Sequence, residues 1–259
     1  MENNIQLVKH RIMKGKTVII TGASTGIGRA MANLFIKKGS NVVMNSLHEE
    51  KLKATYQALG KPQNAICVAG NVGDQGFGQK IVDLAMAKFG RVDVLINNAG
   101  VFAPKPFLEV TNEDLDFFWT TNLKGTYFMT QAAIPKMLER GDGAIINIGT
   151  VLVEHAIAGF PATAPLTSKG AIHALTRQLA AEFGKSNIKI NTIAPGIIRS
   201  PLQGKMGVED ADSLAGLHLL NRIGEAKEVA EAAYYLATAD FVTGETFNVA
   251  GGHTIGHAI

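Results

Sequence analysis

The sequence of 259 residues has one cysteine, no long apolar run and a small excess of positive charge. Cys67 cannot form a disulfide within the chain, so nothing indicates an oxidising compartment. No stretch approaches the roughly 20 apolar residues of a membrane-spanning helix. Residues 1–16 also lack the apolar segment of a signal peptide. We therefore expect a cytoplasmic protein with no membrane partner.

Charged residues are sparse and scattered. They make up 18% of the chain, the formal net charge is +3, and the longest basic run is Lys37–Lys38. A nucleic-acid partner requires a clustered basic face, so we expect no nucleic-acid partner. We also expect no metal site. Hydrophobic residues reach 46%, which excludes intrinsic disorder and is enough for one large core.

What the sequence does contain is an alternation of short apolar segments with longer amphipathic ones. Strands are predicted at 17–20, 41–44, 65–69, 92–97, 143–148, 188–193 and 246–249. These segments are apolar throughout, which indicates burial on both faces, and the segments between them have helical spacing. The pattern predicts an N-terminal tail (1–13) and one α/β domain (14–259). Its core would be a doubly wound parallel sheet of about seven strands flanked by helices.

Glycines mark the ends of helices and one long loop. Glycine is preferred at helix C-caps, and several predicted helices end in one, at positions 39, 60, 90, 141 and 184. Residues 196–224 are too long for a plain strand-to-helix connection. Loops of this length inside compact domains are usually functional, so we predict a substrate loop or lid.

The segment TGASTGIG (21–28) places Gly22, Gly26 and Gly28 between the first strand and a helix. Glycine there permits a tight turn and lets a pyrophosphate approach the backbone at the helix N-terminus. The spacing is G-x-x-x-G-x-G.

With this segment and others, the chain resembles the short-chain dehydrogenase/reductase family over nearly its whole length, from about Lys14. The matching segments are TGASTGIG (21–28), NNAG (97–100), Asn122 in TTNLKG, INIGT (146–150), Lys169 in SKGA, APG (194–196) and TGETFNVAGG (243–252). The resemblance implies a Rossmann-type fold, a nicotinamide cofactor and hydride transfer to or from a small carbonyl or alcohol substrate. It also implies a homo-oligomer, a dimer or tetramer, paired through helices near 112–139 and 164–184.

The resemblance also assigns the cofactor site. The implied residues are Gly22, Ser24, Thr25, Gly26, Ile27, Gly28, Ser46, Asn71, Val72, Asn98, Ala99, Gly100, Lys169, Pro195, Gly196 and Ile198. At the end of the second strand an acid would favour NAD and an arginine would favour NADP. Ser46 stands there, so no carboxylate repels a 2′-phosphate, and we predict a weak preference for NADP over NAD. Asn71 stands where the family usually has aspartate.

The proton-transfer site departs from the family. The family uses serine, tyrosine and lysine with an asparagine behind them. Asn122 and Lys169 match, Thr150 replaces the serine, and Pro165 falls on the tyrosine position. No tyrosine lies between 128 and 233. The interval between Thr150 and Pro165 is two residues longer than usual, and His155 in that insertion is the best substitute acid.

Proline is tolerated only in the first turn of a helix. The helix that carries Lys169 is therefore predicted to begin near Pro165, with Thr163 as its cap. His173, four residues after Lys169, is predicted to be structural.

Three functions remain open on these residues. The favoured one is an NAD(P)-dependent oxidoreductase with a rearranged proton donor. The others are a cofactor-binding protein without turnover, acting as a sensor, scaffold or subunit, and a lyase or isomerase on the same fold. A lysine of reference pKa near ~10.4 is a poor proton donor at neutral pH. We therefore expect weak turnover that Pro165→Tyr would raise.

Overall fold

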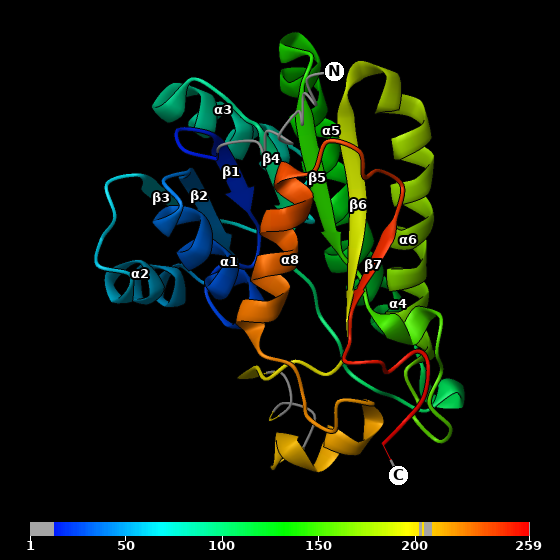
Figure 1. The fold of residues 1–259 in the computed structure, drawn as a ribbon. Coiled ribbons are helices and arrows are strands. Elements are labelled where there is room, and N and C mark those ends of the chain that lie inside the picture. The colour runs from blue at the N-terminus through cyan, green and yellow to red at the C-terminus, as the bar shows by residue number, and fades with distance from the viewer. Residues whose placement is uncertain (1–12, 202–203, 205–208, 259) are drawn as a thin grey trace, which may run out of the picture.

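The computed structural model describes residues 13–201, 204 and 209–258. Within them lies one parallel sheet in the order β3-β2-β1-β4-β5-β6-β7 (Figure 1). The strands are β1 (Thr17–Ile20), β2 (Asn41–Ser46), β3 (Ala65–Ala69), β4 (Val94–Asn97), β5 (Gly143–Ile148), β6 (Ile188–Pro195) and β7 (Thr246–Val249). The predicted doubly wound parallel sheet is confirmed. Its order reverses between β1 and β4, the point where ligands bind in open α/β sheets.

Alternate residues of each central strand enter two separate cores. Val18 and Ile20 of β1 pack into one apolar cluster, whereas Ile19 packs into the other. Ile19 lies between Val43 of β2 and Leu95 of β4 in the parallel register. Burial on both faces explains why these strands are apolar throughout.

Helices cover both faces of the sheet (Figure 1). One face carries α1 (Gly26–Lys37), α2 (Glu49–Ala58) and α8 (Ala226–Thr238), and the other carries α3 (Phe77–Phe89), α5 (Gly125–Arg140) and α6 (Thr163–Phe183). Shorter helical segments are η1 (Phe107–Glu109), α4 (Asn112–Phe118), the π-helical η2 (Trp119–Lys124), η3 (Val151–Val153), η4 (Gly184–Ser186) and η5 (Ala211–Leu217). No helix among the described residues has both the length and the apolar character needed to cross a membrane.

The ends of α6 differ in detail from the prediction. Pro165 lies in its first turn as expected, but the N-cap is Ala162, and Thr163 is already helical. At the other end Gly184 keeps a right-handed conformation, and Asn187, with φ of 60°, takes the left-handed one. The chain therefore leaves the helix through η4. Glycines 39, 60, 90 and 141 do adopt the positive φ of helix C-caps.

The described residues begin at Met13, the last residue of the predicted tail. Met13 is buried in the core, and its carbonyl oxygen accepts a hydrogen bond from Ser40 Oγ at 3.0 Å. Residues 1–12 of the predicted tail (1–13) lie outside the described residues, as do 202–203 and 205–208 of the predicted lid.

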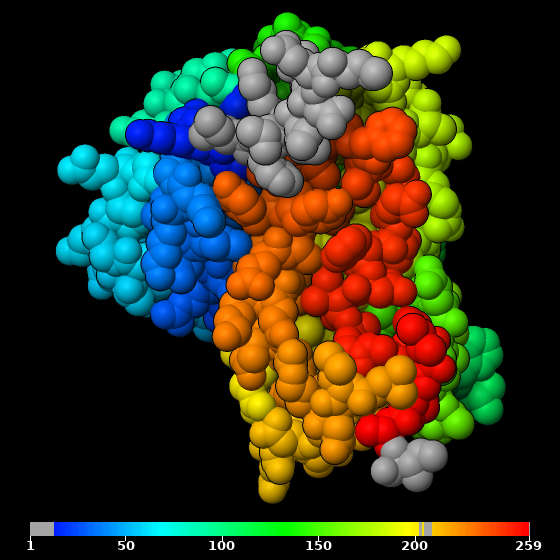
Figure 2. Space-filling model, viewed as in Figure 1, coloured from blue at the N-terminus to red at the C-terminus, as the bar shows by residue number. Residues whose placement is uncertain are grey.

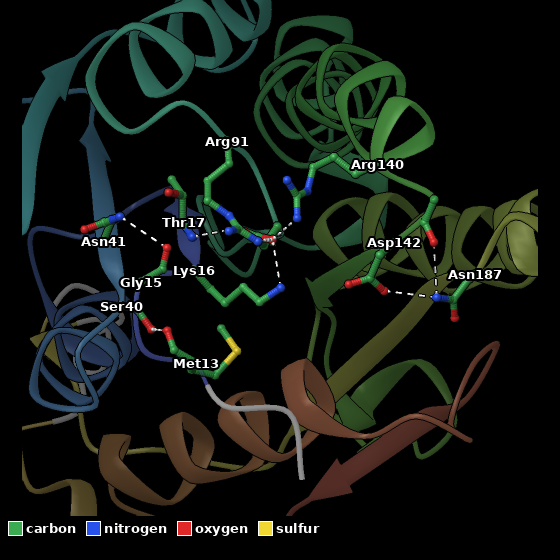
Figure 3. Close-up of polar contacts among 12 residues, drawn as sticks. Met13, Gly15, Lys16, Thr17, Ser40, Asn41, Arg91, Arg140, Asp142 and Asn187 are labelled. Atoms are coloured by element: carbon green, nitrogen blue, oxygen red, sulfur yellow. Dashed lines mark hydrogen bonds and ion pairs between the residues drawn. The ribbon is translucent and has the colours of Figure 1, made fainter. Parts of the chain in front are cut away.

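A cluster of charges closes the amino end of the sheet (Figure 3). The buried carboxylate of Asp93 binds Arg91 through two hydrogen bonds of 2.6 and 2.5 Å. It also lies 3.5 Å from Lys16 and 3.5 Å from Arg140, and it accepts a hydrogen bond from the backbone N–H of Thr17. The cluster ties the start of β1 to the start of β4.

Candidate active site

A cavity of about 640 Å³ opens at the carboxyl ends of the strands, where the sheet order reverses. Its walls are almost wholly apolar, and Phe102 and Phe160 stack with ring centroids 6.0 Å apart. Among the described residues that line it, Lys169 is the one ionisable side chain. The other polar side chains on the wall belong to Asn98, Thr150, Ser200 and Ser213.

The glycine loop follows β1 and reaches the cavity wall through Ile27. Gly22 and Gly26 have φ values of 63° and 50°, which side chains rarely adopt, and Ile27 lines the cavity. A Cβ at Gly28 would collide with the carbonyl oxygen of Gly22, so this glycine permits the turn itself. The first backbone N–H groups of α1 have no partner within the helix, so the loop fits the pyrophosphate of a dinucleotide.

Asn98 fixes the glycine loop to β4. Its Nδ2 donates to the carbonyl oxygens of Thr21 and Gly22 at 2.9 and 3.1 Å. Thr21 Oγ1 in turn accepts hydrogen bonds from the backbone N–H groups of Asn98 and Ala99. These contacts join NNAG to TGASTGIG and bring two distant sequence motifs to one site.

At the end of β2, the hydroxyl of Ser46 points into the protein. Ser46 Oγ lies 2.9 Å from Ser24 Oγ, both residues are buried, and Ser46 Oγ also accepts from the backbone N–H of His48. His48 itself is exposed. The structure thus gives Ser46 an internal hydrogen-bonding role beside the glycine loop.

Asn71 and Val72 stabilise the turn after β3. The amide of Asn71 donates to Asp74 Oδ1 and accepts from the backbone N–H of Gly73. Val72 is buried, and a Cβ at Gly125 would collide with it.

Asn122 lies behind the cavity wall and is fully buried in η2. Its Oδ1 accepts from Val101 N at 2.8 Å, and its Nδ2 donates to Val101 O at 3.1 Å and to Ser168 Oγ at 2.9 Å. Both amide hydrogens and one acceptor site are therefore used within the protein. Asn122 braces the segment after β4 against α6.

Lys169 projects from α6 to the floor of the cavity. Its Nζ donates a hydrogen bond of 2.6 Å to the carbonyl oxygen of Ile148, and a Cβ at Gly100 would lie 3.2 Å from Nζ. The residue is 8% exposed and has no ion pair with any described carboxylate. Because burial disfavours its charged form, the pKa of Lys169 falls to about 8.

Thr150 shares the cavity floor with Lys169 and is held from below by His173. The backbone N–H of Thr150 donates to His173 Nε2 at 3.5 Å, and Thr150 Oγ1 accepts from Leu152 N at 3.3 Å. A Cβ at Gly149 would collide with the His173 ring. Burial lowers the pKa of His173 to about 4, so the ring is neutral at neutral pH and Nε2 is free to accept. The helical spacing from Lys169 was the sequence signal for this support.

Beneath the floor runs a polar network that the sequence pattern did not reveal. Asn97 Nδ2 donates to Asn147 Oδ1 at 2.9 Å, and Asn147 Nδ2 donates to Thr176 Oγ1 at 2.9 Å. Thr176 Oγ1 lies 2.7 Å from Thr192 Oγ1. The network joins β4, β5, α6 and β6, and its one signal was an asparagine at the end of otherwise apolar strands.

His155 and Pro165 both lie off the cavity wall. Pro165 is buried in α6, and its carbonyl oxygen accepts from Ser168 Oγ. His155 faces the C-terminal segment, where its Nε2 lies 3.3 Å from His257 Nε2. We therefore do not assign the proton donor to His155. No group of three His, Cys, Asp or Glu side chains among the described residues is placed to hold a metal ion.

The predicted lid closes on itself at its base. Ile198 and Gly224 form a parallel bridge, Arg199 N donates to Gly224 O, and Gly224 N donates to Ile197 O. Beyond this neck, η5 returns to the cavity and lines it with Ser213, Leu214, Gly216 and Leu217. Pro195, Gly196 and Ile198 line the same wall.

Comparison with known proteins yields one consistent group. A family model described as enoyl-(acyl carrier protein) reductase matches residues 22–254. The oxidoreductase UcpA of Salmonella typhimurium is 34% identical over 95% of this chain and 97% of its own. The 3-oxoacyl-[acyl-carrier-protein] reductase FabG of Thermotoga maritima is 32% identical over 94% of this chain and 99% of its own.

Solved structures of similar proteins have the same fold as this chain. A structure of ElxO with NADP bound superposes with a TM-score of 0.86 and is 32% identical, covering 92% of this chain and 98% of that one. A tyrosine-to-phenylalanine variant of ElxO with NADPH bound is 33% identical, with a TM-score of 0.85, and covers 92% of this chain and 98% of that one. A structure described as ribose-5-phosphate isomerase from Brucella melitensis is 30% identical, with a TM-score of 0.87, and covers 94% of both chains.

Proposed function

The chain belongs to the short-chain dehydrogenase/reductase family, and from that premise we propose that it reduces a largely apolar carbonyl compound, or oxidises the matching alcohol, with NAD(P). The observation that carries the proposal is the cavity floor. There Lys169, the one ionisable side chain among the described lining residues, lies beside Thr150 in a pocket of mostly apolar wall that reaches back to the glycine loop. Such a pocket favours an apolar substrate body with one polar group directed at the floor.

The cofactor, when bound, supplies or accepts the hydride. The glycine loop would hold its pyrophosphate, Asn98 keeps that loop in place, and Lys169 and residues 195–198 line the cavity beyond it. A preference for NADP is supported by the end of β2, where Ser46, Leu47 and His48 place no carboxylate against a 2′-phosphate. The first acids after this point are Glu49 and Glu50 in α2.

We propose Lys169 as the proton donor in place of the tyrosine. In reduction, an N–H bond of the Lys169 ammonium breaks and an O–H bond forms on the substrate oxygen, leaving a neutral amine that solvent protonates again. Thr150 directs its hydroxyl-bearing side chain to the same floor and orients that oxygen. The pKa of about 8 replaces the reference value used for the sequence argument. A donor is most effective when its pKa is near the working pH, so a buried lysine serves where an exposed one would not.

Two measurements test the proposal. The first is titration of the protein with NADPH and NADH by fluorescence, and binding of neither would contradict it. The second is reduction of hydrophobic ketones across pH 6–10. The proposal expects log kcat/KM to fall as pH rises through about 8, where Lys169 loses its proton. A profile that stays flat to pH 10 would leave the cofactor site standing and remove Lys169 as donor.

The alternatives have distinct outcomes in the same assays. A cofactor-binding protein without turnover would bind NADPH. It would not oxidise the bound NADPH, whichever carbonyl compound is added. An isomerase, for which the named Brucella melitensis relative is the favouring observation, would convert a sugar phosphate with no net consumption of NADPH.

We also propose a homo-oligomer. Phe117, Trp119 and Tyr127 project from α4, η2 and α5 with 53%, 37% and 48% of their surface exposed. Exposed aromatic side chains on three successive helical segments suit a contact with a second copy. Light scattering at micromolar concentration tests this, and a monomer would contradict it.

A further inference from the structure

Four histidines from three separate segments gather beside the cavity. His155 follows β5, His218 follows η5, and His253 and His257 belong to the segment after β7. The ring centroids of His218 and His253 are 5.2 Å apart, those of His155 and His253 are 5.4 Å apart, and those of His155 and His257 are 5.3 Å apart. We call these four residues the histidine cluster.

The histidine cluster contains no acid that could neutralise an imidazolium. His253 is fully buried, and neither ring nitrogen has a hydrogen-bond partner within the described structure. On the segments packed around it, Glu154 is exposed, Asp212 is paired with Arg199, and Glu228 is paired with Arg222. Arg222 adds a positive charge near His218.

Neutral rings at His253 and His218 are therefore a condition of the packed arrangement. Burial lowers the pKa of His253 to about 4, and the other three histidines of the cluster lower it further wherever they carry charge. Burial also lowers the pKa of His218. His155 Nε2 and His257 Nε2, 3.3 Å apart, can share a hydrogen only while one ring is neutral.

Two of the segments that meet in the histidine cluster, residues 150–160 and η5, also line the cavity. Ala258 N donates to Gly216 O and Leu220 N donates to Gly251 O, both at 3.1 Å, so the C-terminal segment is bonded to the lid. His218 Nε2 accepts from Ile197 N on the cavity wall at 3.1 Å. Figure 2 shows the C-terminal segment in red lying directly against residues 211–224 in orange.

We infer that the histidine cluster is an acid-sensitive latch. While its rings are neutral it holds η5 over the cavity with residues 250–258 packed against it, and protonation releases both segments together. The inference concerns access to the cavity and does not depend on which reaction the site performs. A latch of this kind would ease exchange of a bulky apolar ligand at acidic pH.

The size of the effect follows from His253. A ring that titrates near 6.5 when released and near 4 when packed shifts the open-to-closed ratio by about tenfold between pH 7.5 and 5.5. Protonation of His218, whose pKa burial also lowers, would add to this. The expected change is therefore tenfold or more.

Hydrogen exchange followed by mass spectrometry tests the latch on the full chain, with EDTA present and rates corrected for the intrinsic pH dependence of exchange. We expect peptides covering 211–224 and 250–258 to open about tenfold more at pH 5.5 than at pH 7.5. Peptides from β4 and β5 should not change. An equal change in the core strands would show general acid destabilisation and overturn the inference.

Variants make the assignment specific. His253→Phe keeps an aromatic ring and removes the titration, so the pH response of both peptides should be lost. His257→Phe is the second variant, for use if His253→Phe does not fold. It changes an exposed position, breaks the His155–His257 pair without disturbing the core, and should reduce the pH response of both peptides. His48→Asn changes a histidine outside the cluster and should keep the full response. A full response in His257→Phe and His253→Phe would overturn the latch.

Discussion

Two buried charged groups at opposite ends of the sheet, Asp93 and Lys169, have opposite surroundings. At the amino end Asp93 has three cations around it and the backbone N–H of Thr17 (Figure 3). At the carboxyl end Lys169 has a carbonyl oxygen and no described carboxylate.

The pKa values show the consequence. Burial alone would raise the pKa of Asp93, but the Arg91 hydrogen bonds, the Thr17 N–H and the nearby cations outweigh it and hold that pKa below its usual value. For Lys169, burial acts unopposed and lowers the pKa to about 8. A buried charge with counter-ions, such as Asp93, keeps its charge and holds elements of the fold together. A buried charge without a counter-ion, such as Lys169, has a pKa close to neutral pH and can exchange a proton there.

The largest expected effect comes from removing the charge at the carboxyl end. Under the proposed mechanism, Lys169→Met should lower kcat/KM for ketone reduction by ~10²–10⁴-fold, since no other side chain among the described lining residues is ionisable. Steady-state kinetics with NADPH measures it. Lys169→Arg is the matched control, because it keeps the charge but does not titrate near pH 8. Near-wild-type rates in either variant would contradict the role.

Breaking the amino end should affect stability and leave chemistry alone. Asp93→Asn removes a buried anion from three cations, and losing one partner of such a group costs about 3–5 kcal/mol. Urea unfolding measures the loss, and Asp83→Asn on the exposed face of α3 is the control. The Asp93 contribution should be present at neutral pH and lost as pH falls below the usual aspartate range, because the folded pKa is the lower one. A loss under 1 kcal/mol would show that the cluster is not an anchor.

Lys169→Met should also stabilise the fold. The pKa of Lys169 is about 8 in the folded state and 10.5 in the unfolded state. Between these two pH values the unfolded state binds one proton more than the folded state. Below pH about 8 the buried ammonium therefore lowers the free energy of unfolding by its full amount. A shift of this size corresponds to at most about 3 kcal/mol. Urea unfolding should show Lys169→Met more stable than the native chain at pH 7, with the gap narrowing as pH rises toward 10. An unchanged gap would mean that the stabilisation comes from packing and not from charge.

The same contrast explains how much could be predicted from sequence. The strands and the glycine loop are local patterns of apolar runs and turn glycines, so all seven strands and the cofactor motifs could be located. Asn122 could be matched to the family's asparagine, but its hydrogen bonds with Val101 and Ser168 could not be predicted, because only the folded packing brings those residues near. The histidine cluster draws on positions 155 to 257, and no sequence spacing reveals that meeting.

The pKa of Lys169 is likewise a property of burial. Composition and spacing place a lysine four residues after a proline but do not show that its ammonium lies without a counter-ion. The expectation of a poor donor followed from the reference pKa, and the folded environment supplies the reason to revise it.

The smallest expected effect separates the two accounts of the proton path. Pro165→Tyr restores a phenol four residues before Lys169 on the same helix, and proline there already lies in the first turn, so the backbone tolerates the exchange. If Lys169 is a sufficient donor, the gain in kcat/KM should stay within about tenfold, because the added phenol supplies a proton that the site already has. Pro165→Phe is the matched control, since it adds the ring without the hydroxyl and reports any effect of packing. A gain of 100-fold or more in Pro165→Tyr, absent from Pro165→Phe, would show that the native site lacks an effective donor and that the lysine serves only to hold and orient.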